Sequence, residues 1–246
     1  MDADDWDGAD LRQMVTLAAG RVSDRKLDLF NLWCCHALQP YLRDRRSVAA
    51  VRYAERHVDE GWVEAIERAA VRAAAKQVVE ELADWSRTPP RRTPAEYRAR
   101  RVYAQAALVV QQTVVADLPS RGVLSNAEYT ATAYAWANND AAPAAPDDSP
   151  AIQALREVHL RRQASIFRDI AGNPFRPVGF DPQWRTGDVL GLARAAYEDG
   201  AFERLPMLAD ALMDAGCDDA AILDHCRGPG PHARGCWVVD LVLGKV

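Results

Sequence analysis

Residues 217–245 read CDDAAILDHCRGPGPHARGCWVVDLVLGK, and this stretch decides how the C-terminal half of the chain folds. Glycine and proline alternate from Gly228 to Pro231, and Gly235 follows, so residues 227–235 cannot form a regular helix. The segments on either side are apolar enough to enter a core. We therefore expect the turn to return the chain against the preceding helices and to bring Cys236 into or near the core.

Four side chains of this stretch are candidate metal ligands: Cys217, Cys226, His232 and Cys236, with His225 as a spare. Thiolate and imidazole are the ligands that zinc prefers, and four of them close a structural site. The spacing C-x8-C-x5-H-x3-C resembles that of small CCCH zinc fingers with the last two ligands exchanged. Those fingers have little apolar sequence between their ligands, whereas residues 218–225 form an amphipathic helical turn here.

The same residues have two other interpretations besides a zinc site. Cysteine is often buried as a small apolar side chain, and we expect the cysteines to be buried singly around a tight turn, with Trp237 packed beside them. A catalytic Cys236 activated by His232 is the third interpretation, and it requires a helix that the glycines disfavour.

Three phrases carry a family resemblance: FRDIAGNPFRPVGFDPQWRTGDVLGLARAAY, RLPMLADALMDAGCDDAAILDHC and GPGPHARGCWVVDLVLGK. They are similar to the C-terminal half of a large bacterial family that occurs as many paralogues. The phrases SDRKLDLFNLWCCHAL and SVAAVRYAERHVDEG resemble the usual first half of that family. The resemblance is weak between about residues 75 and 150, and it implies no activity and no functional residue.

The rest of the chain predicts an all-α protein. Apolar residues recur at helical spacing along most of it, and capping boxes begin helices at Thr93 and Ser125. We expect a multi-helix bundle whose C-terminal part consists of helical hairpins in a solenoid-like stack. Residues 172–184, GNPFRPVGFDPQW, are a proline-rich connector whose aromatic side chains require an ordered position packed across the helices. Residues 2–9 read as a frayed acidic leader.

Composition shifts divide the chain. Residues 139–150, NDAAPAAPDDSP, lack apolar periodicity and are typical of a linker. We therefore predict a helical N-terminal domain in residues 1–140, a linker in residues 141–150 and a helical C-terminal domain in residues 151–246.

Charge and hydropathy exclude several classes. The net charge of −5 argues against general affinity for nucleic acid or anionic membranes, and no apolar run approaches the ~20 residues that span a bilayer. Residues 1–10 lack the apolar core of a secretory signal, and five cysteines with two of them adjacent are unlike a disulfide framework. We expect a reducing cytoplasm as the compartment.

Six arginines fall in residues 87–101, which a phosphate or RNA patch would explain, although a solvated helix start explains them more simply. The chain has no phosphate-binding loop, dinucleotide fingerprint, serine elbow or H-E-x-x-H motif. We therefore expect a non-catalytic interaction or adaptor protein with a protein partner and no cofactor. The alternatives are a small zinc-stabilised protein that contacts nucleic acid, and an enzyme of unfamiliar type that uses the C-terminal cysteines and histidines. The oligomeric state is not predicted.

Overall fold

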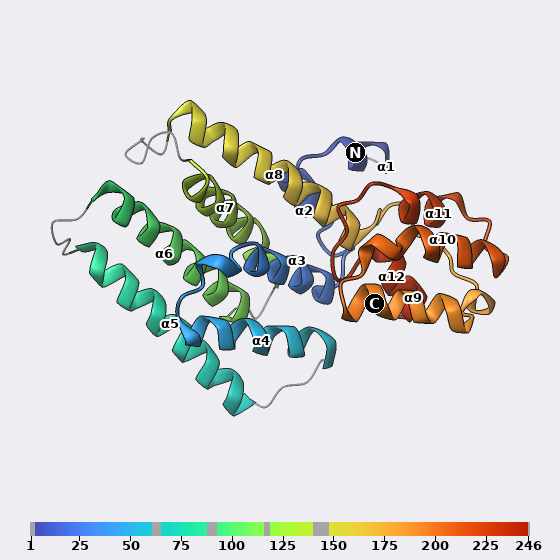
Figure 1. Cartoon of the computed structure of the whole chain (residues 1–246), viewed down its shortest axis with the longest axis horizontal. Coiled ribbons are helices and arrows are strands. Elements are labelled where there is room, and N and C mark those ends of the chain that lie inside the picture. The colour runs from blue at the N-terminus through green and yellow to red at the C-terminus, as the bar shows by residue number, and fades with distance from the viewer. Residues whose placement is uncertain (1–2, 61–64, 88–92, 116–118, 140–147, 246) are drawn as a thin grey trace. The chain divides into compact units, whose positions relative to one another are not determined.

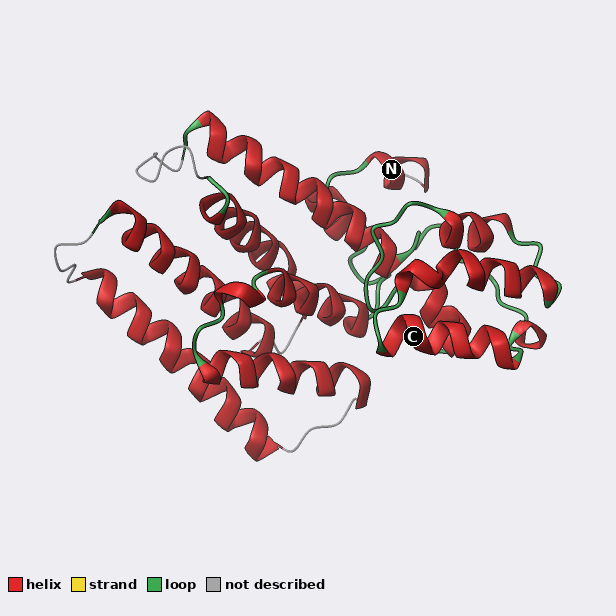
Figure 2. Ribbon diagram, in the orientation of Figure 1, coloured by secondary structure: helices red, strands yellow, loops and turns green. Residues whose placement is uncertain are grey.

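The structure is a computed structural model, and it describes residues 3–60, 65–87, 93–115, 119–139 and 148–245. Within these ranges all regular structure is helical, in agreement with the all-α prediction (Figure 2). The described helices are α1 (Ala3–Gly8), α2 (Leu11–Leu17), α3 (Asp24–Ala37), α4 (Arg45–Glu60), α5 (Ala65–Arg87), α6 (Pro94–Val115), α7 (Pro119–Ala137), α8 (Pro150–Ala171), α9 (Gly187–Glu198), α10 (Leu205–Asp214), α11 (Ala220–Arg227) and α12 (Trp237–Leu243), with single 3-10 turns at Gln39–Tyr41, Pro182–Trp184 and Phe202–Arg204 (Figure 1).

The chain forms two compact units. The first unit contains Met1–Leu29 and Ala164–Val246, and the second contains Phe30–Gln163. The predicted linker at residues 141–150 does not coincide with the limits of these units. Most of that linker lies outside the described residues. The first unit joins the two ends of the chain because aromatic and charged side chains of the first 29 residues pack on the last 83. Trp6, for example, lies 6.2 Å from Phe167 between ring centroids.

The second unit is a helical bundle built from α4 to α7 and the adjoining parts of α3 and α8. Thr93 begins α6 with the predicted capping box, in which Thr93 N–H donates to Glu96 and Glu96 N–H donates to Thr93 Oγ1. The box predicted at Ser125 is wrong, because α7 already begins at Pro119. Proline is well suited to the first position of a helix, so the helix starts at Pro119, before the predicted box.

The core of the first unit lies among α9, α10, α11 and α12. Its fully buried side chains include Val189, Leu208, Leu212, Ile222 and Val242. The short helices begin at caps that the sequence supplies: Thr186 caps α9, and the Asp219 carboxylate accepts from two backbone N–H groups of α11. The expected short helical hairpins are present, since α9 to α12 share this core, and residues 237–243 form the helix α12.

The proline-rich connector of the first unit is ordered, as predicted. Phe180 and Trp184 pack edge to face at 5.3 Å and lie against the core of α9 to α12, and Phe175 packs against Trp6. Arg185 then donates to the backbone carbonyl groups of Leu241 and Val242. These carbonyls belong to the last turn of α12, where the C-cap Gly244 N–H reaches Leu241 only at 3.4 Å, so the connector also closes the end of that helix.

The N-terminal segment differs from its prediction. Residues 3–8 form α1 rather than a frayed leader, and Trp6 is 1% exposed. Arg168 of α8 donates to the backbone carbonyl groups of Trp6 and Ala9. The acidic composition of this segment suggested a frayed leader, but Trp6 packs with Phe167. The apolar burial of this aromatic side chain orders the helix.

A buried ion pair joins α3 to α12 within the first unit. The Asp240 side chain is 2% exposed, and its carboxylate accepts from Arg25 Nη1 at 2.7 Å and from Lys26 Nζ. Lys26 also donates to the carbonyl oxygen of Gly235, and Arg25 donates to the Tyr197 hydroxyl. Burial lowers the pKa of Lys26, against the opposing effect of the Asp240 charge. Both cations therefore share one carboxylate.

We expect Asp240→Asn to lower the free energy of unfolding by about 3–5 kcal/mol, because it leaves two largely buried cations without their counter-charge. Urea denaturation monitored by circular dichroism measures this change. Asp210→Asn is the matched control, since Asp210 pairs with Arg227 at the surface with its side chain 72% exposed. That control should change stability by less than about 1 kcal/mol. Equal losses for the two variants would contradict the assignment.

Candidate metal centre

Four side chains from separate segments of the first unit converge on one point. Asp169 lies in the last turn of α8, His225 lies in α11, His232 lies in the turn that follows, and Cys236 directly precedes α12. One ligand atom from each side chain lies within 4.8 Å of the other three, and among the described residues this group could hold a metal ion. The Gly/Pro turn makes this possible, because it returns the chain from His225 to Cys236.

Asp169 is at the centre of the group. Its Oδ1 accepts from His232 Nδ1 at 2.7 Å and from His225 Nε2 at 3.1 Å, and its Oδ2 accepts from the backbone N–H of Ala233 at 2.8 Å. The Asp169 side chain is 2% exposed. Burial opposes ionisation, but the hydrogen bonds and charges of the two histidines outweigh it, so the pKa of Asp169 lies below its usual value. The carboxylate is therefore ionised and held by three donors.

Cys236 is fully buried, and its Sγ lies 3.2 Å from His225 Nε2. Burial is the largest influence on the thiol, and with the Asp169 charge it raises the pKa well above the usual value. The backbone N–H groups of Val238 and Val239 donate to the sulfur and oppose that shift. Without a cation the side chain is a neutral thiol and a poor nucleophile, because the thiolate is the reactive form.

The two histidines differ at their second ring nitrogens. His225 Nδ1 accepts from the indole Nε1–H of Trp237 at 3.1 Å. His232 Nε2 is buried and has no hydrogen-bond partner among the described residues. An indole N–H only donates and an ionised carboxylate only accepts, so the proton of each neutral imidazole lies on the nitrogen that faces Asp169. His225 then carries its proton on Nε2 and His232 carries its proton on Nδ1.

The donor set and its spacing fit zinc. Zinc binds two imidazole nitrogens, a thiolate and a carboxylate at bond lengths of about 2.0–2.3 Å, which places neighbouring tetrahedral ligands about 3.3–3.7 Å apart. The hydrogen-bonded atoms of the group are 2.7, 3.1 and 3.2 Å apart. All four ligand atoms lie within 4.8 Å of one another, so displacements of up to about 1 Å would bring them to the spacing of a zinc site. The Ala233 N–H holds the second carboxylate oxygen in the way that outer partners orient metal ligands.

The structure brings together two of the four predicted ligands, His232 and Cys236. Cys217 and Cys226 are not in the group and lie in the apolar core of α9 to α12. Burial raises the pKa of the Cys226 thiol to about 12 and also raises that of Cys217. The expectation of cysteines buried in the core describes both of them. Cys236 is buried as well, but beside two histidines and a carboxylate.

Asp169 and His225 are the two members that the sequence did not assign. His225 was only a spare ligand in the predicted set. Asp169 lies 56 residues before His225, so no spacing motif connects them. One signal was present: Asp169 lies among Ile166, Phe167 and Ile170, on the buried face of α8. A carboxylate at such a position requires buried donors.

A pocket of about 840 Å³ lies beside the group, entirely within the first unit. Asp169, His225, His232 and Trp237 contribute to its wall. Its basic side chains outnumber its acidic ones, although the whole chain is acidic. The basic residues are Arg21, Lys26, Arg168, Arg176 and Lys245, and the acidic residues are Asp7, Asp169 and Asp240.

The arginine-rich segment at residues 87–101 is described only in part, because residues 88–92 lie outside the described residues. Within α6, Arg98 donates to the carbonyl oxygen of Asn139, and the guanidinium of Arg101 stacks 3.8 Å from the centre of the Trp136 ring. These two arginines pack within the second unit. No described helix has both the length and the apolar character needed to cross a bilayer.

The N-terminal cysteines are core residues. Cys34 and Cys35 are at most 1% exposed, and His36 is exposed and lies 3.1 Å from Glu55. Burial raises the pKa of Cys35 to about 12, so this thiol is neutral and unreactive.

The fold and the donor set thus define an all-α protein with a buried Asp-His-His-Cys group that could hold a metal ion. Comparisons with protein-family models, with curated proteins and with solved structures find no match for this chain. The bacterial family that the sequence phrases resemble therefore stays a prediction.

The turn that delivers Cys236 depends on Gly235. Its φ of +90° is in the left-handed region, and an added Cβ would lie 2.5 Å from Leu29 Cδ1. We expect Gly235→Ala to lower the free energy of unfolding by about 2–3 kcal/mol, from backbone strain and the clash with Leu29, measured by urea denaturation. Gly191→Ala is the control: this helical glycine has open space at Cβ, and the change should be neutral or stabilising. A neutral Gly235→Ala would contradict the role of the turn.

Proposed function

We propose that the first unit binds one zinc ion through Asp169, His225, His232 and Cys236, and that this chain is a zinc-stabilised, non-catalytic helical protein. The observation that carries the proposal is the approach of all four ligand atoms to within 4.8 Å of one another from four separate segments. The two imidazoles and the thiol select zinc over calcium and magnesium, which prefer oxygen ligands.

The ion would have a structural role. Four protein ligands complete a tetrahedral zinc site and leave no open position for substrate. Such a site would join the end of α8 to α11, to the Gly/Pro turn and to the start of α12 by direct bonds. The depth of the group supports this role, since the side chains of Asp169 and His232 are 2% and 10% exposed.

Zinc would also balance the negative charge that Asp169 and a Cys236 thiolate would place in the group. Asp169 is an ionised carboxylate beside a thiol whose pKa is raised partly by that same negative charge. A divalent cation reverses the effect, because it favours the thiolate and balances both negative charges. The proposal assigns a reducing cytoplasm as the compartment, since all five cysteines are free thiols.

The test compares zinc content among matched variants. Protein purified without added metal should contain about one zinc per chain, and Asp169→Asn, His225→Gln and Cys236→Ala should each lose most of it. Cys217→Ala and Cys226→Ala are the controls, because these buried thiols lie outside the group and their variants should keep zinc. Atomic emission gives the stoichiometry, and circular dichroism confirms that each variant is folded.

Two results would contradict the proposal. One is wild-type protein whose unfolding temperature is unchanged by excess zinc after removal of metal by a chelator, since a ligand of the folded state must raise it. The other is loss of zinc in the Cys217, Cys226 and Cys236 variants with zinc retained in Asp169→Asn and His225→Gln, which would favour the ligand set read from the sequence.

A protein partner is the second candidate function, and the basic lining of the pocket favours it. Five basic side chains against three acidic ones in a chain of net charge −5 make this pocket a local site for an acidic segment. Arg21 lies at its exposed edge, where its guanidinium stacks 4.9 Å from the centre of the Phe175 ring. The adaptor role predicted from the sequence would then reside in the first unit, and nucleic acid stays the less favoured partner.

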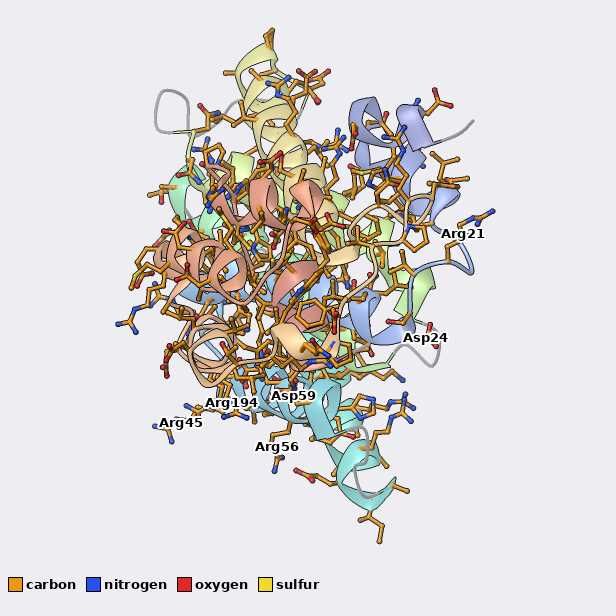
Figure 3. All side chains as sticks on the ribbon, turned by 90° about the vertical axis from the view of Figure 1, so that its right-hand side faces the viewer. Arg21, Asp24, Arg45, Arg56, Asp59 and Arg194 are labelled. Atoms are coloured by element: carbon orange, nitrogen blue, oxygen red, sulfur yellow. The ribbon has the colours of Figure 1, made fainter. Side chains whose placement is uncertain are left out.

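A fluorescein-labelled polyglutamate peptide tests this second function by fluorescence anisotropy. Binding should weaken steeply as salt rises, and Arg21→Glu should weaken it at least several-fold, because charge reversal replaces attraction with repulsion. Arg194→Glu is the matched control: Arg194 is also exposed in the first unit but lies outside the pocket, well apart from Arg21 (Figure 3). Equal effects of the two substitutions would reduce the binding to general charge attraction and contradict a site in the pocket.

A further inference from the structure

The two histidines differ in what surrounds the ring nitrogen that faces away from Asp169, and this difference affects how each could bind an ion. In a zinc site, a ligating histidine almost always donates its other N–H to an acceptor such as a carboxylate, a carbonyl oxygen or water. His225 has the reverse arrangement, because its Nδ1 already accepts a hydrogen bond from Trp237 Nε1–H at 3.1 Å. His232 Nε2 has no hydrogen-bond partner among the described residues, so nothing that they contribute competes there.

Ligation moves the protons in a defined way. To bind zinc, His225 must free Nε2 and His232 must free Nδ1, and each neutral imidazole then carries its proton on the opposite nitrogen. Cys236 binds as the thiolate, so its proton leaves to solvent. His232 meets no competing donor at Nε2 among the described residues. His225 acquires an Nδ1–H that faces the indole N–H of Trp237, and two donors at 3.1 Å cannot share a hydrogen bond.

The indole is held from one side. The Trp237 ring packs over Gly172, where an added Cβ would lie 3.2 Å from the indole Cγ. Trp237 is half-buried and lines the pocket beside the group. A displaced indole therefore has space in the pocket, while the close contact with Gly172, which lines the same pocket, limits movement toward that residue.

We propose that Trp237 fixes His225 in the tautomer that cannot bind metal, so that zinc loading must break the Trp237–His225 hydrogen bond and move the indole toward the pocket. This inference rests on the proposed zinc site and assigns its regulation. Trp237 is a positioning residue that weakens the affinity of the site and makes its zinc exchangeable. Occupancy of the ion then changes one wall of the pocket.

The first test is the zinc affinity of Trp237→Phe, measured by competition with a chromophoric chelator. Phenylalanine keeps an aromatic ring over Gly172 and removes the N–H, so zinc should bind about 2- to 10-fold more tightly, which is the range expected for one neutral hydrogen bond. Trp184→Phe is the matched control, with the same chemical change in the connector, and should leave the affinity unchanged. A supporting outer partner would behave in the opposite way, with affinity lost on removal.

The second test does not depend on a variant that folds. In ¹⁵N-labelled wild-type protein, the indole N–H signal of Trp237 should be at a hydrogen-bonded position without metal and should move on addition of zinc. The indole signals of the other tryptophans should shift less. Trp237→Phe assigns the signal if that variant folds, and selective labelling assigns it otherwise.

Each outcome has one meaning. If wild-type protein fails to bind zinc, the proposed zinc site fails. If wild-type protein binds zinc but Trp237→Phe binds it equally or less tightly, or the indole signal of Trp237 stays in place, the zinc site stands and the role of Trp237 is overturned. Tighter binding by Trp237→Phe together with a moved indole signal supports the inference.

Discussion

The buried carboxylate of Asp169 is the constraint on which the C-terminal unit depends. An ionised carboxylate removed from water costs many kilocalories per mole unless donors surround it, and its donors here are two imidazoles and one backbone N–H. All three donors come from residues 225–233, so satisfying Asp169 fixes where α11 ends and how the Gly/Pro turn crosses α8. The position of Cys236 then follows from the path of that turn.

Much of the fold could be predicted from the sequence, because helices depend on local signals. Apolar spacing found the main helices, and the capping box at Thr93 begins α6 as expected. One error was local: α7 begins at Pro119, before the predicted box at Ser125, because proline suits the first position of a helix. The other arose where tertiary packing overrides local signals, since Trp6 orders α1 although the residues around it are acidic. Its packing partner Phe167 was not visible in the local sequence.

Only two of the four members of the candidate site, His232 and Cys236, could be predicted from the sequence, and the reason is chemical. Cysteine as a metal ligand and cysteine as a small apolar side chain look the same in a sequence, so Cys217 and Cys226 were grouped with Cys236. The members that distinguish the site, Asp169 and His225, are 56 residues apart and meet only after folding. A carboxylate on an apolar helix face was the one local sign of the site.

The first unit is assembled from both ends of the chain, which affects the order of events during synthesis. Residues 30–163 form a continuous unit that can fold as it emerges. Leu27 and Leu29 emerge earlier and are buried, and they belong to the unit that includes residues 164–246. At ordinary translation rates the partners of these residues arrive roughly 10–40 s later. During that interval the start of the nascent chain presents an apolar face, together with Arg25 and Lys26, to the surrounding solution.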